Sequence, residues 1–371
     1  MQTNSVGRKY QHVEDLLLTH GAVGGLHAVE RLVHIARDPS TLEIKWDGNP
    51  VIFWGKQHGQ FTMMTKNAWD YYKRGSRMLA DGTPVVPTRA KDLQDFILGT
   101  GKISDERIAY AKELSSLWPL MEEVSPDNGF FEGSFLFSPM SPKEIETNVF
   151  KFQPNITRFE VEMESLTGQR IENATAMISA TGFYNSIGSF IEKRPEYTKS
   201  SNQVIVQGPV TSTAPGIIQP NITDTELDLL KDAMTVTEYI KKNADAIDTF
   251  LNSKPFMKTP GEIVYTFLNA VHRKEYIIHL FKGWANENLS ERRRAVLYKH
   301  QHDLVVLLRS IEKITALKHK VMSRINQDEL TDIKMVNPEG YVQPHPNVEF
   351  RYDIPDQFIK LINQEKWAPR K

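Results

Sequence analysis

The residues whose types and spacing best suit a chemical reaction lie in one short stretch, EIKWDGNP, at positions 43–50. Lys45 is the single cation of an apolar run, between Ile44 and Trp46, and Asp47 follows two positions later. Burying a lysine ammonium is costly unless the amine is paired or neutral. Two interpretations follow: Lys45 lies at the rim of a strand, or its amine is buried because it reacts.

A lysine in this setting could attack the α-phosphorus of a nucleotide, which requires an uncharged amine. A nearby cation favours the neutral form. Residues two apart on a strand share a face, so we expect Lys45 and Asp47 to point the same way. Gly48 permits a tight turn and a close approach of the backbone to a ligand. The same four letters also fit a surface lysine before an Asp-Gly turn.

The composition narrows the classes of protein to consider. The chain has 371 residues, 40% hydrophobic and 25% charged, which is ordinary for a globular protein. The net charge of −1 gives no global sign of nucleic-acid binding, so any such contact must come from local basic patches. The absence of cysteine excludes disulfides, thiolate metal sites and cysteine nucleophiles. We expect neither a signal peptide nor a membrane span, and a cytoplasmic location.

The elements that must position Lys45 are short strands preceded by helices. Residues 11–37 have helical spacing, interrupted by GAVGG. From 41 to about 190 the pattern predicts strands, and RAKDLQDFILG predicts a helix among them. The predicted strands are TLEIKWDG, PVIFWGK, QFTMMTK, GFFEGSFLF, NVFKFQ and RFEVEME, with GKQHGQ as a hairpin connection. Residues 195–222 are rich in Pro, Ser, Thr and Gly, which predicts a linker.

The period of the pattern changes after the predicted linker. Residues 223–328 indicate a helical block, with a long amphipathic run from Ser290. Strand-like sequence returns in EGYVQP and VEFRYD, followed by a terminal helix, DQFIKLIN. We therefore predict an α+β protein with four parts: an N-terminal helical segment (1–40), a first part of the α+β domain (41–222), an inserted helical domain (223–328), and closing strands with a terminal helix (329–371).

The order of these motifs resembles the covalent nucleotidyltransferase superfamily, which comprises ATP-dependent DNA ligases, RNA ligases and mRNA capping enzymes. It is most similar to an uncharacterised phage-encoded branch, in which an HLEDL-like segment (here HVEDL) precedes a KWDG-like motif. The resemblance implies that residues 41–222 and 329–371 form an adenylation domain of antiparallel sheets with flanking helices. For a phage-encoded protein it also implies the host cytosol.

The resemblance assigns roles to individual residues. Lys45, beside Asp47, would carry the nucleotide as a phosphoramidate. Glu339 in EGYV would be the metal-side carboxylate, with Glu132 in FFEGSFLF as a second, and Arg351 in VEFRYD would contact the α-phosphate. The further residues assigned to the nucleotide are Glu43, Ile44, Trp46, Gly48, Lys66 after the hairpin, Glu132, and Phe159 for stacking on the base.

This sequence departs from the superfamily at two positions. Ser134 stands where a second carboxylate is common, which leaves ribose recognition open. Arg351 stands where a lysine is usual, and the two cations bind phosphate with different geometry. Lys66, Glu132, Phe159 and Glu339 also have plain structural interpretations as a hairpin-end lysine, a solvent-facing strand residue, a core ring and a turn.

The resemblance implies an ATP-dependent, Mg²⁺-dependent polynucleotide ligase-like enzyme that joins 5′-phosphate to 3′-hydroxyl ends, with RNA favoured and DNA possible. The alternatives are transfer of AMP to a protein or small molecule, and a non-catalytic nucleotide-binding or structural module. Twenty residues follow Arg351, so we expect no C-terminal OB domain. The basic clusters HRK, ERRR and KHK of the helical block could grip RNA phosphates, or the block could be a lid with solvated charges.

Overall fold

A computed structural model describes residues 11–74, 86–187, 189–190, 199–212, 224–253, 260–271, 277–325, 332–343 and 350–353. These residues combine helices with antiparallel and mixed sheets, which confirms the predicted α+β class. The chain forms two compact units: unit 1 contains Ile44–Val210 and Glu329–Glu339, and unit 2 contains Arg8–Glu43, Thr211–Asp328 and Gly340–Lys371. The HRK cluster at 272–274 and the predicted terminal helix lie outside the described residues.

Unit 1 is built around a six-stranded sheet with the order β10-β9-β5-β3-β4, in which β11 pairs with β9. Its strands are β3 (Val51–Gln57), β4 (Gln60–Thr65), β5 (Gly129–Phe137), β9 (Ala176–Ser186), β10 (Ser189–Phe190) and β11 (Val204–Gln207). The predicted hairpin joins β3 to β4 through His58 and Gly59, which both have positive φ, the signature of a two-residue hairpin turn. The predicted linker is wrong at β11, because the buried Val204–Gln207 segment pairs in parallel with β9.

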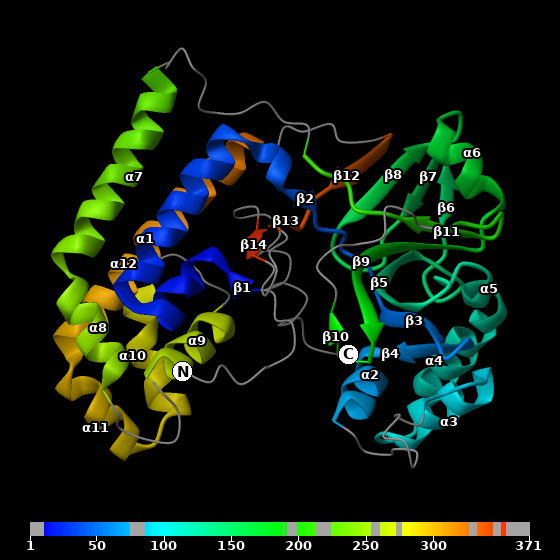
Figure 1. The fold of residues 1–371 in the computed structure, drawn as a ribbon, viewed down its shortest axis with the longest axis horizontal. Helices are drawn as coiled ribbons and strands as arrows, with labels where there is room; N and C mark the ends of the chain where they lie inside the picture. The colour runs from blue at the N-terminus through cyan, green and yellow to red at the C-terminus, as the bar shows by residue number, and fades with distance from the viewer. Residues whose placement is uncertain are drawn as a thin grey trace. The chain divides into compact units, whose positions relative to one another are not determined.

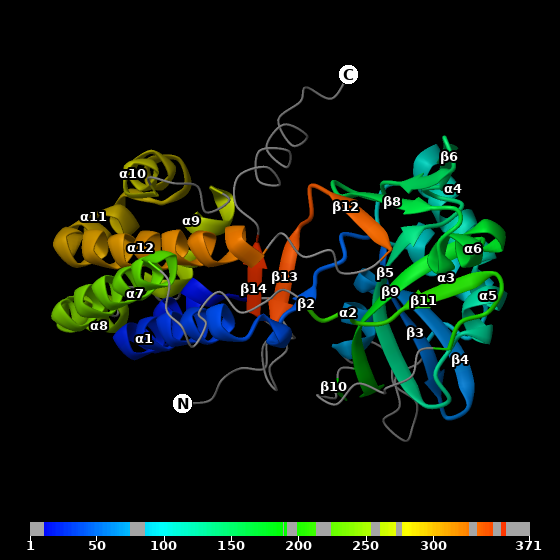
Figure 2. The same ribbon diagram turned by 90° about the horizontal axis from the view of Figure 1, so that it is seen from above.

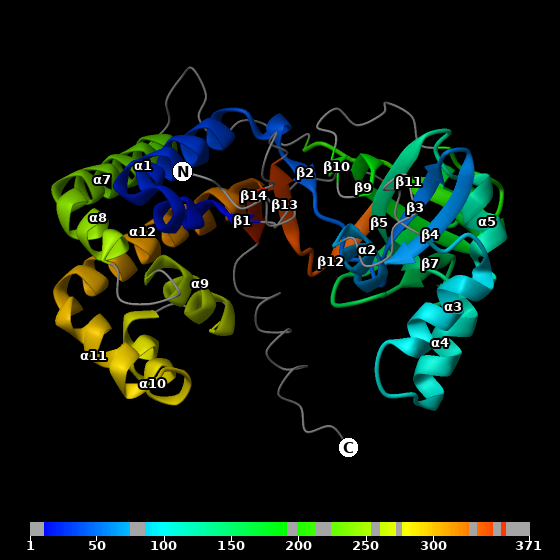
Figure 3. The same ribbon diagram turned by 60° about the horizontal axis from the view of Figure 1, so that its bottom comes forward.

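Each face of this sheet is covered by different helices, because alternate residues of a strand point to opposite faces. One face packs against α3 (Ala90–Gly99), α4 (Asp105–Ser116) and α5 (Trp118–Glu123), of which α3 and α4 lie side by side in Figure 3. The core on this face includes Ile52, Trp54, Met63, Leu114, Phe131 and Ile178. The opposite face packs against α2 (Lys66–Lys73) through Phe53, Met64, Trp69, Phe130 and Tyr184.

A second sheet of unit 1 has the order β12-β8-β7-β6. Its strands are β6 (Glu144–Glu146), β7 (Val149–Phe152), β8 (Arg158–Glu162) and β12 (Ile333–Val336), and α6 (Leu166–Asn173) follows β8. The β12 strand comes after the helical block in sequence and pairs antiparallel with β8, so the chain returns to unit 1 through a strand that was not predicted. Asp332, just before β12, accepts hydrogen bonds from Thr167 N at 2.8 Å and Thr167 Oγ1 at 2.7 Å.

Unit 2 is mainly helical. It contains η1 (Val13–Asp15), α1 (Leu16–Arg37), η2 (Pro39–Thr41), α7 (Asp224–Lys242), α8 (Ala244–Asn252), α9 (Pro260–Ala270), α10 (Ile277–Asn288), α11 (Glu291–Lys299) and α12 (Gln301–Ile325). Helix α1 packs against α7, α8 and α12 (Figure 1). The predicted break in α1 is present at Gly21, whose φ is 64°. Asp248 caps the second half of α1 by accepting from Ala22 N at 2.9 Å.

A four-stranded sheet, with the order β1-β14-β13-β2, joins distant parts of the chain. It consists of β1 (Gln11–His12), β2 (Glu43–Ile44), β13 (Gly340–Gln343) and β14 (Phe350–Asp353). The β1 strand is parallel to β14, and β13 is antiparallel to β14, beside which it lies in Figure 2. The unit boundaries therefore differ from the predicted domain boundaries: α1, β13 and β14 share a unit with the helical block.

A buried ion pair ties the start of unit 2 to its longest helix. Lys318 Nζ on α12 lies 3.0 Å and 3.1 Å from the two carboxylate oxygens of Glu14. The two side chains are 2% and 0% exposed. Apolar side chains of α1, among them Leu17 and Leu32, are also fully buried, which explains why the predicted N-terminal segment is not a separate part. None of the helices in the described residues combines the length and apolar character needed to cross a membrane.

Candidate functional site

Lys45 is paired with Glu339, a residue 294 positions away in sequence. The Lys45 ammonium donates to Glu339 Oε1, and the two side chains are only 11% and 12% exposed. The sheet order explains this meeting: Lys45 directly follows β2, Glu339 directly precedes β13, and these two strands are neighbours. Both residues belong to unit 1, so the paired nucleophile candidate and carboxylate candidate lie within one compact body.

Asp47 holds the segment after Lys45 in place. Its carboxylate is 4% exposed and accepts from Asn155 Nδ2 at 2.6 Å, Ile156 N at 2.9 Å and Thr157 N at 2.8 Å. The predicted strand over 41–48 is wrong beyond Ile44, because β2 ends there and these hydrogen bonds tie the chain to the turn between β7 and β8. The geometry makes Asp47 a positioning residue for Lys45.

Gly48 lets this segment lie directly on β5. A Cβ atom at position 48 would stand 2.6 Å from Ser134 Oγ and 2.7 Å from the carbonyl oxygen of Phe135. Asn49 N also donates to that carbonyl at 2.8 Å. Any larger residue would push the segment off the strand, so the glycine of the motif has a structural cause here.

Ser134 identifies the face of the sheet that the Lys45 segment covers. Along β5, Phe130, Glu132 and Ser134 alternate with Phe131 and Gly133, and Phe130 packs against Trp69 of α2. Glu132 therefore lies on this face between Phe130, which contacts α2, and Ser134, which contacts the Gly48 segment, roughly 7 Å along the strand from each of these two residues.

Glu132 is half-buried and accepts from Tyr184 Oη at 2.6 Å. Tyr184 lies on β9 and packs edge-on against Phe53 and Trp69, at ring-centroid distances of 5.7 Å and 5.1 Å. The structure thus gives Glu132 a tyrosine partner and a fixed position on the same face as Gly48. Sequence reasoning missed Tyr184, because β9 itself was not predicted; the run AMISATGFYNS contains the alternation that could have indicated it.

The aromatic residues near Lys45 are packed inside unit 1. Phe159 is fully buried and stacks on Phe152 at 5.4 Å, with Trp46 at 5.9 Å on a tilted contact. This arrangement presents no exposed ring face of Phe159 to a nucleotide base. Trp46 is 5% exposed, and its Nε1 has no hydrogen-bond partner among the described residues. Ile44, at 3% exposed, serves the core.

Three further assigned residues, Glu43, Lys66 and Arg351, lie on β2, α2 and β14. Lys66 begins α2 directly after the hairpin and is exposed, while Thr65 caps that helix by accepting from Ala68 N at 3.2 Å. Glu43 lies in β2, in unit 2. Arg351 lies in β14, opposite Val342, also in unit 2; its side chain is outside the described part of the chain.

The described residues contain no cluster of three or more His, Asp or Glu side chains that could enclose a metal ion. Glu339 places a single carboxylate beside Lys45. The second assigned carboxylate, Glu132, accepts a hydrogen bond from Tyr184 Oη.

A family model described as a family of unknown function (DUF6267) matches residues 8–73. The matched segment runs from before β1 to the end of α2 and so includes Glu14, Lys45, Asp47 and Lys66. No curated protein and no solved structure has a significant match to the chain.

Proposed function

We propose that the protein is an ATP-dependent nucleotidyltransferase of the polynucleotide ligase type, in which Lys45 accepts AMP before it is passed to a nucleic-acid end. The observation that carries the proposal is the pairing of Lys45 with Glu339. The two motifs that the resemblance places on either side of the nucleotide are 294 residues apart, and their functional side chains meet in a largely buried position.

The pair suits the proton transfer that the reaction requires. A lysine amine attacks phosphorus only after it loses a proton. The contacting carboxylate favours the charged ammonium in the resting pair, and it is also the group placed to accept the proton when the amine attacks. The Lys45 nitrogen would then form a bond to the α-phosphorus, the bond to the β-phosphate oxygen would break, and pyrophosphate would leave. In the following steps AMP passes to a 5′-phosphate, and a 3′-hydroxyl displaces it.

The positioning of the amine also supports the proposal. Transfer of a phosphoryl-type group depends mainly on alignment and charge stabilisation. Asp47 and Gly48 fix the segment after Lys45 on two sides, against the β7–β8 turn and against β5. Bound Mg²⁺ would supply neutralisation of phosphate charge, with Glu339 as the protein ligand.

One observation favours the non-catalytic alternative. Phe159 is fully buried between Phe152 and Trp46, whereas a nucleotide platform needs an accessible ring face. A structural module could keep the Lys45–Glu339 pair as a buried ion pair of its core. Covalent labelling separates the two functions.

The test is incubation of the purified chain with ATP labelled at the α-phosphorus and Mg²⁺, followed by denaturing electrophoresis. We expect a covalent label that acid releases and alkali does not, as for a phosphorus–nitrogen bond. Lys45→Arg should abolish the label, because arginine keeps a cation beside Glu339 but its guanidinium stays protonated. A folded parent protein that takes no label would overturn the proposal.

Two controls make the labelling specific. Lys56→Arg applies the same substitution to a half-buried lysine of β3 in unit 1, and it should leave the label unchanged. Lys318 forms the other deeply buried Lys–Glu pair, so Lys318→Arg tests whether burial with a carboxylate is sufficient for labelling. A Lys45→Arg protein labelled like the parent would place the nucleophile elsewhere. Addition of 5′-phosphorylated RNA or nicked DNA then distinguishes a ligase from a transferase with another acceptor.

A further inference from the structure

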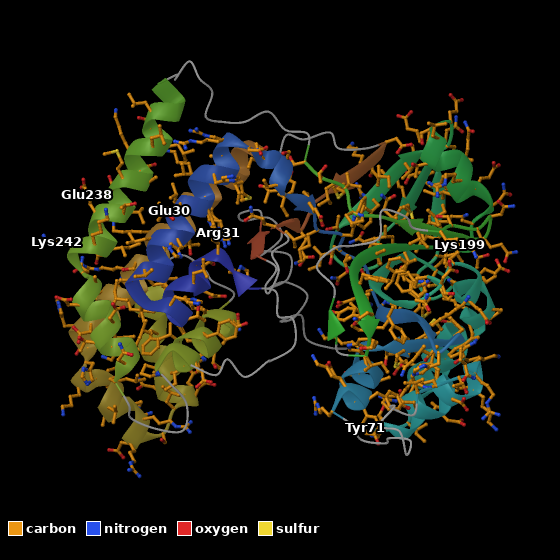
Figure 4. All side chains as sticks on the ribbon, in the orientation of Figure 1. Glu30, Arg31, Tyr71, Lys199, Glu238 and Lys242 are labelled. Atoms are coloured by element: carbon orange, nitrogen blue, oxygen red, sulfur yellow. The ribbon has the colours of Figure 1, made fainter. Side chains whose placement is uncertain are left out.

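Helix α2 and the end of α3 carry an aromatic cluster that reaches the surface of unit 1. Tyr71, Tyr72 and Phe96 contact one another, with ring centroids 5.2 to 5.7 Å apart. Tyr71 is 40% exposed and is labelled on α2 in Figure 4, whereas Tyr72 and Phe96 are half-buried. A phenol ring held by two further rings is a rigid surface group, because its neighbours restrict its side-chain torsions.

The same helix carries three exposed cations, of which Arg74, three positions after Tyr71, lies on the side of α2 that Tyr71 occupies. Lys66, Lys73 and Arg74 are exposed, and none of the three forms an ion pair within the described part of the chain. Asp70 is the single acidic residue between positions 66 and 74, so this segment carries a net charge of +2 (three cations less one carboxylate).

The acidic residues of α3 do not cancel this charge. Asp92 is occupied by Arg89, whose Nη2 lies 2.7 Å from Asp92 Oδ1. Residues 89–96 carry two cations, Arg89 and Lys91, and two carboxylates, Asp92 and Asp95, so this segment has no net charge. The positive side of the cluster is therefore the α2 side, where Tyr71 is also most exposed.

The position of the cluster in unit 1 relates it to the candidate site. Phe96 and Tyr72 pack against the core formed by Phe53, Trp69 and Tyr184. Tyr184 in turn donates to Glu132, which lies on the same face of the sheet as Gly48. A continuous aromatic layer therefore extends from the exposed Tyr71 to the face that the Lys45 segment covers.

We propose that Tyr71, with Arg74 beside it and Lys73 on the flank of the same helix, forms a binding surface for single-stranded polynucleotide. An exposed aromatic ring provides a stacking platform for an unpaired base, and neighbouring cations attract the phosphate backbone; this combination is characteristic of sequence-tolerant single-strand binding. A double-stranded segment has no exposed base face for Tyr71, so the surface selects single strands. The inference rests on the proposed function only where it makes the bound polynucleotide the substrate that receives AMP from Lys45. Binding of the polynucleotide itself does not require catalysis.

The test measures binding of fluorescently labelled oligouridylate and oligothymidylate of about 12 nucleotides by anisotropy over a range of salt concentrations. Tyr71→Phe should bind like the parent. Tyr71→Leu, which keeps apolar volume but removes the ring, should weaken binding about tenfold, since stacking of one base contributes on the order of 1–3 kcal/mol. The two oligonucleotides show whether RNA or DNA is preferred.

The contribution of the cations to phosphate binding is tested with the double variant Lys73→Gln, Arg74→Gln. Each cation that neutralises a single-strand phosphate contributes about 0.7 to the slope of log Kd against log salt, so the slope should fall by about 1.4. The matched control, Lys102→Gln with Lys112→Gln, removes two exposed lysines elsewhere on unit 1 and should leave the slope unchanged. Circular dichroism verifies that each variant is folded.

The outcomes separate this inference from the proposed function. Labelling of Lys45 by ATP should be the same in Tyr71→Leu as in the parent, since Tyr71 is not part of the adenylation site. Absence of ATP labelling with intact, Tyr71-dependent binding would reject the catalytic proposal alone. A parent that does not bind either oligonucleotide, or a Tyr71→Leu variant that binds as tightly as the parent, would overturn the inference; retention of a protein instead of an oligonucleotide on this surface would also overturn it.

Discussion

Asp47 is the residue on which the local geometry around Lys45 most depends. Its buried carboxylate is the acceptor for two backbone N–H groups, of Ile156 and Thr157, and for the Asn155 side chain. A buried donor left without an acceptor costs about 1–3 kcal/mol. We expect Asp47→Ala to lower the free energy of unfolding of unit 1 by roughly 2–5 kcal/mol, measured by urea titration of tryptophan fluorescence.

The substitution Asp47→Asn refines this prediction. Asparagine keeps one carbonyl oxygen at the same place, so it should restore part of the stability lost in Asp47→Ala. Asp127→Ala, at an exposed position of the same unit, serves as the control and should change little. Equal stability of Asp47→Ala and the parent would show that the contacts of the carboxylate contribute nothing to holding the Lys45 segment.

At the scale of elements, the junction of β12 with α6 should depend on pH. Partial burial acts to raise the pKa of Asp332, but hydrogen bonds from the backbone and hydroxyl of Thr167, and from Ser165, outweigh it, so the pKa lies below its ordinary value. A carboxyl group whose pKa is depressed on folding stabilises the native state above its unfolded pKa of about 3.9. That contribution is lost as the pH falls through the folded pKa.

The measurement compares the parent with Asp332→Asn between pH 7 and pH 3. The difference in unfolding free energy should be constant from pH 7 to pH 5 and shrink below about pH 4. Protonation of Asp332 removes from the parent the stabilisation by the ionised carboxylate, which Asp332→Asn lacks at every pH. The exposed Asp127→Asn shows how far general charge effects contribute. A difference that does not change across this range would mean that Asp332 does not titrate with a depressed pKa.

The sequence predicts those elements whose pattern is local. Strands β3, β4 and β5 and helix α3 follow from alternation or helical spacing, and the break in α1 follows from its glycines. Strand β11 was not predicted, because its Val-Ile-Val core stands among Ser, Gly and Pro residues and pairs with β9, about 28 residues earlier. Long-range pairing, which no local pattern contains, decides such elements.

The same distinction holds for the candidate site. The sequence alone shows the residue types of Lys45 and Glu339 and the order of their motifs. The contact between the two side chains depends on the pairing of β2 with β13, which no local pattern predicts. The shared strand face expected for Lys45 and Asp47 is absent, because the turn at 155–157 offers donors that a strand partner would otherwise provide. The partner of Glu132, Tyr184, became visible only with β9 in place.

At the scale of the whole molecule, the Glu14–Lys318 pair is the most deeply buried ion pair among the described residues of unit 2. Lys318→Met removes the ammonium from the buried Glu14 carboxylate and leaves the His12 ring, 3.8 Å away, beside it. Removing one partner of a buried pair typically costs about 3–5 kcal/mol. We therefore expect earlier urea unfolding of unit 2, visible as faster amide hydrogen exchange in α1 and α12.

The double variant Glu14→Gln, Lys318→Met completes a mutant cycle. It should be more stable than Lys318→Met, because neither charge of the pair then remains buried, and the coupling energy of the cycle measures the pair itself. Lys320→Met removes an exposed lysine two residues along α12, whose carboxylate partner Asp232 is itself about half exposed, and should have little effect. Additive effects of the two single substitutions would show that Glu14 and Lys318 are not energetically coupled.

The separation of Glu14 and Lys318 by 304 positions also sets an order of events during synthesis. At about 5–20 residues per second, a ribosome needs roughly 15–60 s to travel from one to the other. Within that interval it synthesises β3 to β11, so all strands of the six-stranded sheet of unit 1 exist before α12, the helix that packs on α1, has been made. Until α7, α8 and α12 have been synthesised, Leu17 and Leu32 lack the helices that cover α1, and we expect these side chains to contact a ribosome-associated chaperone in that interval.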